Sequence, residues 1–260
     1  MRLKIFHTSF CAVLVAMLAS SNAMAARYTE GTAFARKSGA SLYREAHYIY
    51  ATDAGTAQLV VYRCPDGNAF ARKHLRRWPN SVTPDFDFVD ARSGYREGAN
   101  LEAGQVRVYV QRNTDAPLQS KLIPLKPGAV IDAGFDAYLR DHWDTLARDA
   151  AQLPFLIPSR LTFFGVKLDR DTEKDKAAPS LAHLRMRLDA WFGAFIAPME
   201  LTYSRDGQRL RRFEGLGNIR GGDGKNVDVR IEFPQEHDRE IAQSDVDAAI
   251  AEPLAGRCAM

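Results

Sequence analysis

Two polar side chains on one extended segment are the first candidates for chemistry. Glu45 and His47 stand two residues apart among alternating apolar residues, so both should project from the same face of a strand, about 7 Å apart. A carboxylate beside an imidazole could work as an acid/base pair or form half of a metal site. A surface or cross-strand polar pair beside Arg44 explains the same spacing. The pair therefore supports a hydrolase hypothesis without establishing it.

Other catalytic patterns are missing from the sequence. Ser41, Ser93 and Ser159 lack the nucleophile-elbow pattern, no His-Glu-x-x-His occurs, and the glycine-rich run 215–224 departs from phosphate-loop patterns. We therefore expect no catalytic residue, no metal site and no cofactor, and a protein that is not an enzyme.

Two cysteines could form a covalent link. Cys64 precedes the turn Pro65-Asp66-Gly67, and Cys258 lies close to the end of the sequence. In an oxidising compartment they could form a disulfide, which would fasten the C-terminal tail to that turn. Two separate thiols are the alternative, and the residues leave both open. A reactive thiol would need an environment that lowers its pKa, and the sequence indicates none.

Basic residues gather on one segment beside a tryptophan. They are Arg72, Lys73, His74, Arg76 and Arg77, next to Trp78. Such a cluster could contact anionic lipid headgroups or nucleic acid. On a strand, however, the charges divide between two faces, which favours a solvated edge strand. Elsewhere charges of both signs are interleaved, so we expect no nucleic-acid partner.

Alternating side chains predict strands over most of the chain. An apolar residue takes every second position in 106–110, 184–188 and 227–233, as in half-buried antiparallel strands. Weaker strands are predicted at 42–50, 59–63, 69–78, 86–90, 159–168, 199–203 and 210–214. Turn sequences rich in Asp and Gly, such as Asp53-Ala54-Gly55, separate them and favour hairpins.

One segment departs from this rhythm and predicts a long amphipathic helix over 132–151. Asp132 is the expected N-cap and Pro154 lies beyond the end. Its apolar stripe repeats at three- and four-residue steps and consists of Phe135, Tyr138, Leu139, Trp143 and Leu146. The stripe could be plain core, the commoner role of such residues, or could line a cavity for an apolar ligand.

The predicted fold class is α+β, mostly antiparallel β: a strongly curved sheet or incomplete β-barrel wrapped over one long helix. A sheet of about ten strands tends to curl, and the helix supplies apolar surface for its concave face. Because no low-complexity linker interrupts the pattern, we expect a single domain over 26–237. A C-terminal tail follows at 238–260, with a short helix in which Val246, Ala249 and Ile250 share a face.

The N-terminus predicts export. Arg2 and Lys4 precede an apolar run at 10–19 and the small residues Ala23-Met24-Ala25, the order of a cleavable signal peptide over 1–25. The run has about half the length of a membrane-spanning helix, and no later stretch reaches about eighteen apolar residues. We therefore expect a periplasmic or secreted chain that does not span the membrane.

Several strings resemble those of an uncharacterised family of exported proteobacterial proteins. They are Pro65-Asp66-Gly67-Asn68-Ala69-Phe70-Ala71, Asp90-Ala91-Arg92-Ser93-Gly94, Asp132-Ala133-Gly134-Phe135-Asp136 and Arg212-Phe213-Glu214-Gly215-Leu216-Gly217-Asn218-Ile219-Arg220. More remotely, the element order is similar to the half-barrel of periplasmic lipoprotein carriers, which hold acyl chains between a curved sheet and its helices. That second resemblance implies a fold and assigns no ligand residue.

The sequence thus favours a non-catalytic carrier of an apolar or lipid-like ligand, held between the concave sheet and the stripe. A cell-envelope scaffold that binds another protein is the alternative. A hydrolase using Glu45 and His47 comes third.

Cleavage of the N-terminal segment is directly testable. We expect the exported protein to begin at Ala26, because the small residues at positions 23 and 25 fit signal peptidase. N-terminal sequencing of material released from the periplasm checks this, and retention of Met1 would contradict it.

Overall fold

Antiparallel strands dominate the computed structural model, which describes residues 25–76, 82–189 and 197–258. The predicted signal peptide lies outside these residues, apart from Ala25, as do Arg77 and Trp78. Eight strands form the first half: β1 (Ala26–Ala35), β2 (Ser41–Thr52), β3 (Gly55–Arg63), β4 (Ala69–Arg76), β5 (Asp85–Asp90), β6 (Tyr95–Glu102), β7 (Gln105–Gln111) and β8 (Gln119–Pro124). The second half holds β9 (Ala151–Ile157), β10 (Thr162–Arg170), β11 (Leu181–Leu188), β12 (Met199–Ser204), β13 (Leu210–Arg220), β14 (Asn226–Glu232) and β15 (Arg239–Ile241).

Short helices accompany the sheet. They are α1 (Gly134–Asp141), α2 (Trp143–Leu146), α3 (Thr172–Ala177) and α4 (Gln243–Ala251), with 3-10 turns at Pro158–Arg160 and Gln235–His237. None of these described helices combines the length and the apolar character needed to cross a bilayer.

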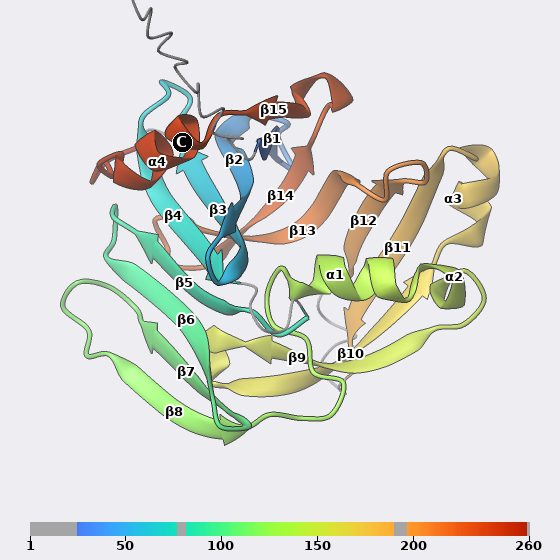
Figure 1. The fold of residues 1–260 in the computed structure, drawn as a ribbon, viewed down its shortest axis with the longest axis horizontal. Helices are drawn as coiled ribbons and strands as arrows, with labels where there is room; N and C mark the ends of the chain where they lie inside the picture. The colour runs from blue at the N-terminus through green and yellow to red at the C-terminus, as the bar shows by residue number, and fades with distance from the viewer. Residues whose placement is uncertain (1–24, 77–81, 190–196, 259–260) are drawn as a thin grey trace, which may run out of the picture.

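The two halves join into one sheet through strand β1. Strands β1 to β8 each pair with their chain neighbours, as do β9 to β14, and β1 pairs with β14. Strands β8 and β9 are therefore the two edges of the main path, and β15 pairs with β1 beside it. The segment between β8 and β9 carries α1 and α2 back across the concave side (Figure 1).

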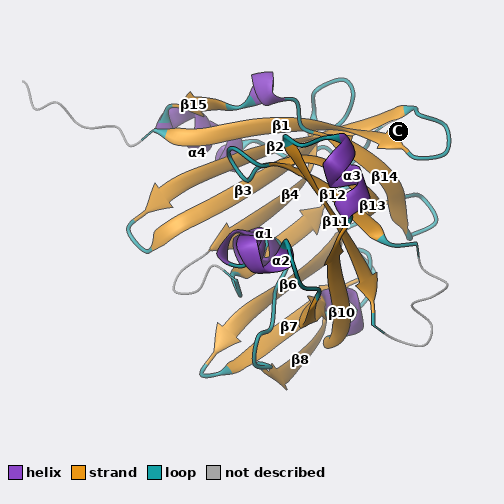
Figure 2. Cartoon of the chain, turned by 90° about the vertical axis from the view of Figure 1, so that its right-hand side faces the viewer, coloured by secondary structure: helices purple, strands orange, loops and turns teal. Residues whose placement is uncertain are grey.

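The sheet curls strongly and remains open. Figure 2 shows α1 and α2 between the two arms of the curve. At the tip of the β9–β10 hairpin, the turn Pro158–Arg160 packs against β6 and β7, and Arg112 donates to the backbone oxygen of Ser159 at 3.3 Å. The prediction of a mostly antiparallel sheet that does not close is confirmed.

Three apolar clusters hold these layers together. One fills the concave side between β2–β7 and β13–β14, with Tyr43, Tyr62, Phe70 and Phe86 among its buried members. A second lies under α1 and α2 against β9–β12. The third lies on the opposite face of β2–β4, where Val246 and Ala249 of α4 cover it. Alternation along the strands sends neighbouring residues to opposite faces, so both faces of β2–β4 are buried.

The predicted long helix is wrong in its extent and its cap. Asp132 adopts a left-handed backbone with φ 45°, and α1 begins after Ala133. His142, with φ −116°, separates α1 from α2. The segment then turns into β9 at Ala151, because β9 side chains such as Leu153 and Leu156 are buried in the two concave-side clusters.

The predicted tail packs on the sheet as β15 and α4. Val246 and Ala249 are buried, as their spacing predicts, but Ile250 is 38% exposed. Positions 246, 249 and 250 point in different directions around the helix, so they cannot all face the strands beneath it equally.

Substitutions of Leu139 test how tightly the concave side is packed. It is completely buried, so Leu139→Ala should destabilise the fold by about 2–5 kcal/mol through lost contacts and a new void. Leu216→Ala, at a residue that is 50% exposed on β13, is the matched control and should change stability by less than about 0.5 kcal/mol. Urea unfolding measures both. A tolerated Leu139→Phe together with a small loss in Leu139→Ala would instead indicate an unfilled cavity.

Candidate functional site

The predicted polar pair forms inside the concave face. His47 Nε2 lies 3.2 Å from Glu45 Oε2, and the Gln58 amide nitrogen lies 3.1 Å from His47 Nδ1. Glu45 is only 5% exposed, and the Phe233 ring meets the imidazole edge-on. Both ring nitrogens are thus engaged, so His47 could act as a base only by giving up a bond. This arrangement favours a structural pair over a hydrolytic one.

A second buried charge pair was not expected from the sequence. Lys73 Nζ lies 2.9 and 2.8 Å from the two carboxylate oxygens of Asp132, and Lys73 is 5% exposed. It joins β4 to the segment that leads into α1. Lys73 stands between Ala71 and Leu75 on the concave side of the alternation, and this charge at an apolar position is the signal that sequence reasoning missed.

Further polar groups continue across the same face. Tyr95 donates to Glu97 Oε2 at 2.5 Å, Arg220 donates to the Tyr95 hydroxyl at 2.9 Å, and Asn218 donates to the Tyr62 hydroxyl at 3.1 Å. Burial raises the pKa of Glu97, against the Tyr95 hydrogen bond and the charge of Lys73. Burial also raises the pKa of Tyr62 well above its ordinary value. The interior therefore combines apolar packing with a fixed polar network.

The residues of the predicted aromatic stripe are packed against neighbouring side chains. Phe135, Leu139 and Leu146 are buried in the second cluster, with Tyr138 and Trp143 packed at its margin. The Phe135 and Phe155 rings meet edge-on at 6.3 Å, and Trp143 meets Tyr203 at 6.2 Å. These contacts favour plain core over the wall of a ligand cavity.

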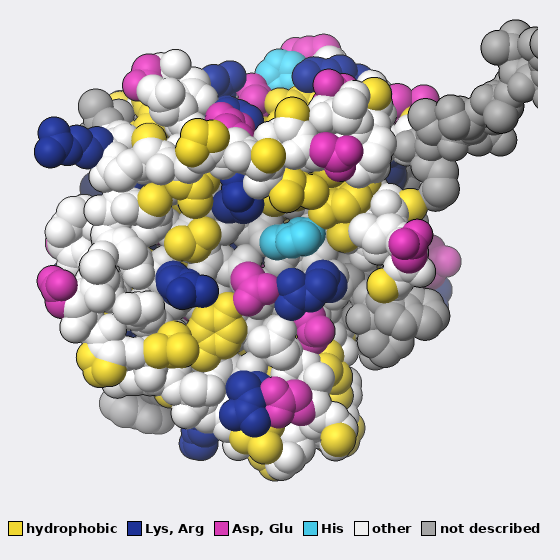
Figure 3. All heavy atoms as spheres, turned by 60° about the vertical axis from the view of Figure 1, so that its left-hand side comes forward, with side chains coloured by type: hydrophobic (Ala, Val, Ile, Leu, Met, Phe, Trp, Pro, Cys, Tyr) yellow, Lys and Arg dark blue, Asp and Glu magenta, His cyan; other side chains and the backbone are white. Residues whose placement is uncertain are grey.

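The basic segment belongs to an interior strand. Its residues in β4 lie between β3 and β5, so the interpretation as an edge strand is wrong. The charges do divide between two faces: Arg72 donates to the backbone oxygens of Ala249 and Glu252, while Lys73 binds Asp132 on the concave side. Basic, acidic and apolar side chains intermingle on the face drawn in Figure 3, with no extended patch of one sign.

A groove on the outer face of the sheet is the candidate binding site. It lies between α4, β15 and the strands β1 and β2, and its volume is about 630 Å³. Its lining residues are Tyr28, Tyr48, Arg63, Arg239, Ile241, Asp245, Ala248, Ala249, Ala251 and Glu252. None of the stripe residues lines it, and its apolar part comes from two tyrosines, an isoleucine and alanines.

Aromatic and charged side chains contact one another within this groove. The rings of Tyr28 and Tyr48 meet edge-on at 5.1 Å, and the Arg239 guanidinium lies 4.1 Å from the centre of the Tyr28 ring. Burial, with the Glu30 carboxylate that accepts its hydroxyl, raises the pKa of Tyr28. Arg239 has no carboxylate partner among the described residues. Arg63, by contrast, is occupied by Glu252 through two bonds of 2.6 Å.

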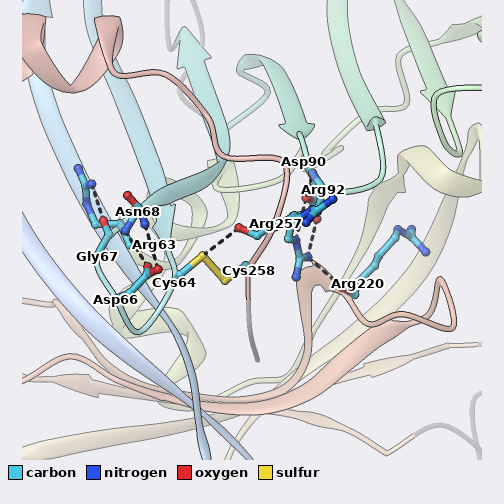
Figure 4. The surroundings of a disulfide bond; sticks show 10 residues. All are labelled: Arg63, Cys64, Asp66, Gly67, Asn68, Asp90, Arg92, Arg220, Arg257 and Cys258. Atoms are coloured by element: carbon cyan, nitrogen blue, oxygen red, sulfur yellow. Dashed lines mark hydrogen bonds and ion pairs between the residues drawn. A yellow bond between two sulfur atoms is a disulfide. The ribbon is translucent and has the colours of Figure 1, made fainter.

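A disulfide fastens the tail that forms one wall of the groove. Cys64, just after β3, is bonded to Cys258, with 5.6 Å between their Cα atoms (Figure 4). The turn beside it is closed by Asp66, which accepts from the backbone nitrogen of Asn68 at 3.0 Å. The disulfide and the hydrogen bonds donated by Arg72 together hold α4 and the residues after it against β3 and β4.

A second groove, of about 310 Å³, lies beside α3 and β11–β13. Its charges are paired with one another, for example Lys174 with Glu200 at 2.6 Å and Arg185 with Asp171 at 3.0 Å. Across the described ranges no three His, Cys, Asp or Glu side chains are arranged to hold a metal ion. The first groove, with its unpaired arginine, is therefore the stronger candidate.

Comparisons with known proteins found one similar solved structure and no matching family. No protein-family model matches the chain, and no curated protein matches it. Among solved structures, it is similar to a β-barrel-like protein of a domain of unknown function, DUF1849, from Brucella abortus. The identity is 12% and the TM-score 0.46, over 81% of this chain and 96% of that one.

Proposed function

We propose that the protein is an exported, non-catalytic binding protein whose outer groove beside α4 holds a lipid-like ligand with an anionic group. The observation that carries this proposal is the groove itself. Its volume of about 630 Å³ falls within the roughly 300–1,000 Å³ of small-molecule sites. Its lining combines apolar contact area with one arginine, Arg239, that has no acidic partner among the described residues.

The two parts of the lining suit the two parts of an amphiphile. Tyr28, Tyr48 and Ile241 offer apolar surface to a hydrocarbon chain. Arg239 could turn from the Tyr28 ring to bind a carboxylate or phosphate through paired N–H groups. Exchange of this exposed cation–π contact for a charged hydrogen bond is favourable, because an exposed cation–π contact contributes only about 0.5–1 kcal/mol.

Export is part of the same proposal. The N-terminal pattern supports it, and the Cys64–Cys258 bond suits an oxidising compartment. The resemblance to exported proteobacterial proteins and to lipoprotein carriers points the same way, but the ligand site proposed here lies outside the half-barrel.

An envelope scaffold is the second candidate. Packing of the stripe favours it, because a carrier that encloses an acyl chain needs an unfilled interior. Native mass spectrometry of protein purified from the periplasm separates the two: a co-purifying lipid supports the binder, and a lipid-free complex with another envelope protein supports the scaffold.

Variants of the groove test the ligand site. With a fluorescent dansyl-labelled fatty acid as probe, Arg239→Gln should weaken binding about 10- to 100-fold, since it removes a charged hydrogen bond. Ala248→Trp should abolish binding by filling the groove. Ser244→Trp, on an exposed position of α4 that does not line the groove, is the matched control and should bind normally. Equal binding by all three variants, or none by the native protein, would contradict the proposal.

A further inference from the structure

Strand β8 is an edge of the sheet and carries exposed leucines. Among the described strands it pairs only with β7, and Figures 1 and 2 both place it at the rim of the sheet. Leu118, just before the strand, is 58% exposed and Leu122 is 40% exposed. An edge of this kind presents free backbone N–H and C=O groups to another strand.

The leucines share one face. Alternation places Ser120 and Leu122 on the outer side, whereas Ile123, which is 7% exposed, faces the core. Extended by one residue beyond the strand, the same alternation places Leu118 on the outer side. Gln119 and Lys121 share the face of Ile123 and are exposed. Lys121 is the single charge on the strand and Pro124 ends it.

The segment Leu118-Gln119-Ser120-Lys121-Leu122 is complementary to itself when reversed. A two-fold axis through Ser120, normal to the sheet, brings Leu118 opposite Leu122 of the partner subunit and Gln119 opposite the partner's Lys121. Facing leucines and an amide beside an ammonium are favourable cross-strand pairs.

Neighbouring registers lose this match. An axis through Lys121 sets its charge against Lys121 of the partner subunit. An axis through Gln119 leaves Leu118 opposite Ser120 of the partner subunit. Of these three registers the side chains favour the one centred on Ser120, and a second copy of the chain is the occupant that this self-complementarity fits.

We propose that two copies associate through their β8 strands in the Ser120-centred antiparallel register, which extends the sheet across a two-fold dimer. A strand pair this short buries less than the roughly 1,200 Å² of a standard interface. The dimer is therefore weak and transient. It leaves the groove beside α4 unobstructed, so it is independent of the proposed ligand.

Sedimentation velocity between about 1 μM and 1 mM protein tests the dimer. The native protein should show a concentration-dependent rise to a dimer. Ser120→Lys, which sets two ammonium groups against each other at the axis, and Leu118→Lys should each weaken association at least about tenfold. Leu216→Lys, an equally exposed leucine away from the edge on β13, is the matched control and should dimerise as the native protein does.

Gln119→Glu identifies the register. In the proposed arrangement it creates two Glu–Lys pairs and should tighten the dimer about two- to tenfold, an effect that added salt removes. A native protein that stays monomeric to 1 mM would overturn the proposal. So would a dimer that Ser120→Lys leaves intact, or one that Gln119→Glu weakens. Circular dichroism confirms that each variant is folded.

Discussion

The buried ion pair between Lys73 and Asp132 is the interaction on which the arrangement of the two halves depends. The main chain passes from the first half of the sheet to the second through the segment between β8 and β9, and Asp132 lies in that segment just before α1. Its carboxylate binds Lys73 in the middle of β4 through both oxygens. The pair fixes where the chain re-enters the concave side, and so where α1 and α2 must lie.

The local backbone fits this role. Asp132 has a positive φ, which aspartate tolerates better than most residues. Ile131 donates to the backbone oxygen of Val82, and a Cβ at Gly134 would collide with that same carbonyl. With the entry point fixed, Phe135 and Leu139 fill the space above β9–β12. The interior is thereby occupied, which is why the candidate ligand site lies outside, beneath a tail held by Arg72 and the disulfide.

Sequence reasoning succeeded where one local pattern determines the structure. Alternating valines predicted β7 and alternating apolar residues predicted β14. A two-residue spacing predicted that Glu45 and His47 project from one face, where their side chains pair. It failed where tertiary contacts override the pattern. The stripe keeps its helical spacing across His142, although the helix breaks there.

Buried charged residues were the other feature that the sequence pattern did not predict. A binary pattern assigns Lys73 and Glu97 to solvent, because only the assembled sheet shows the partners that make their burial tolerable. Strand β8 was missed for a related reason: Gln119, Ser120 and Lys121 carry no apolar alternation, and the strand exists because β7 offers it a free edge. The groove likewise unites β1, β2, β15 and α4, elements distant in the sequence.

A double-mutant cycle on the Lys73–Asp132 pair tests this account most directly. The free energy of unfolding is measured for the native protein, for Lys73→Met, for Asp132→Asn and for the double variant. We predict that each single variant loses about 3–5 kcal/mol, because it leaves a buried charge without its partner, and that the double variant loses far less than the sum. Single losses below about 1 kcal/mol that add in the double variant would show that the pair does not fix the segment that leads into α1.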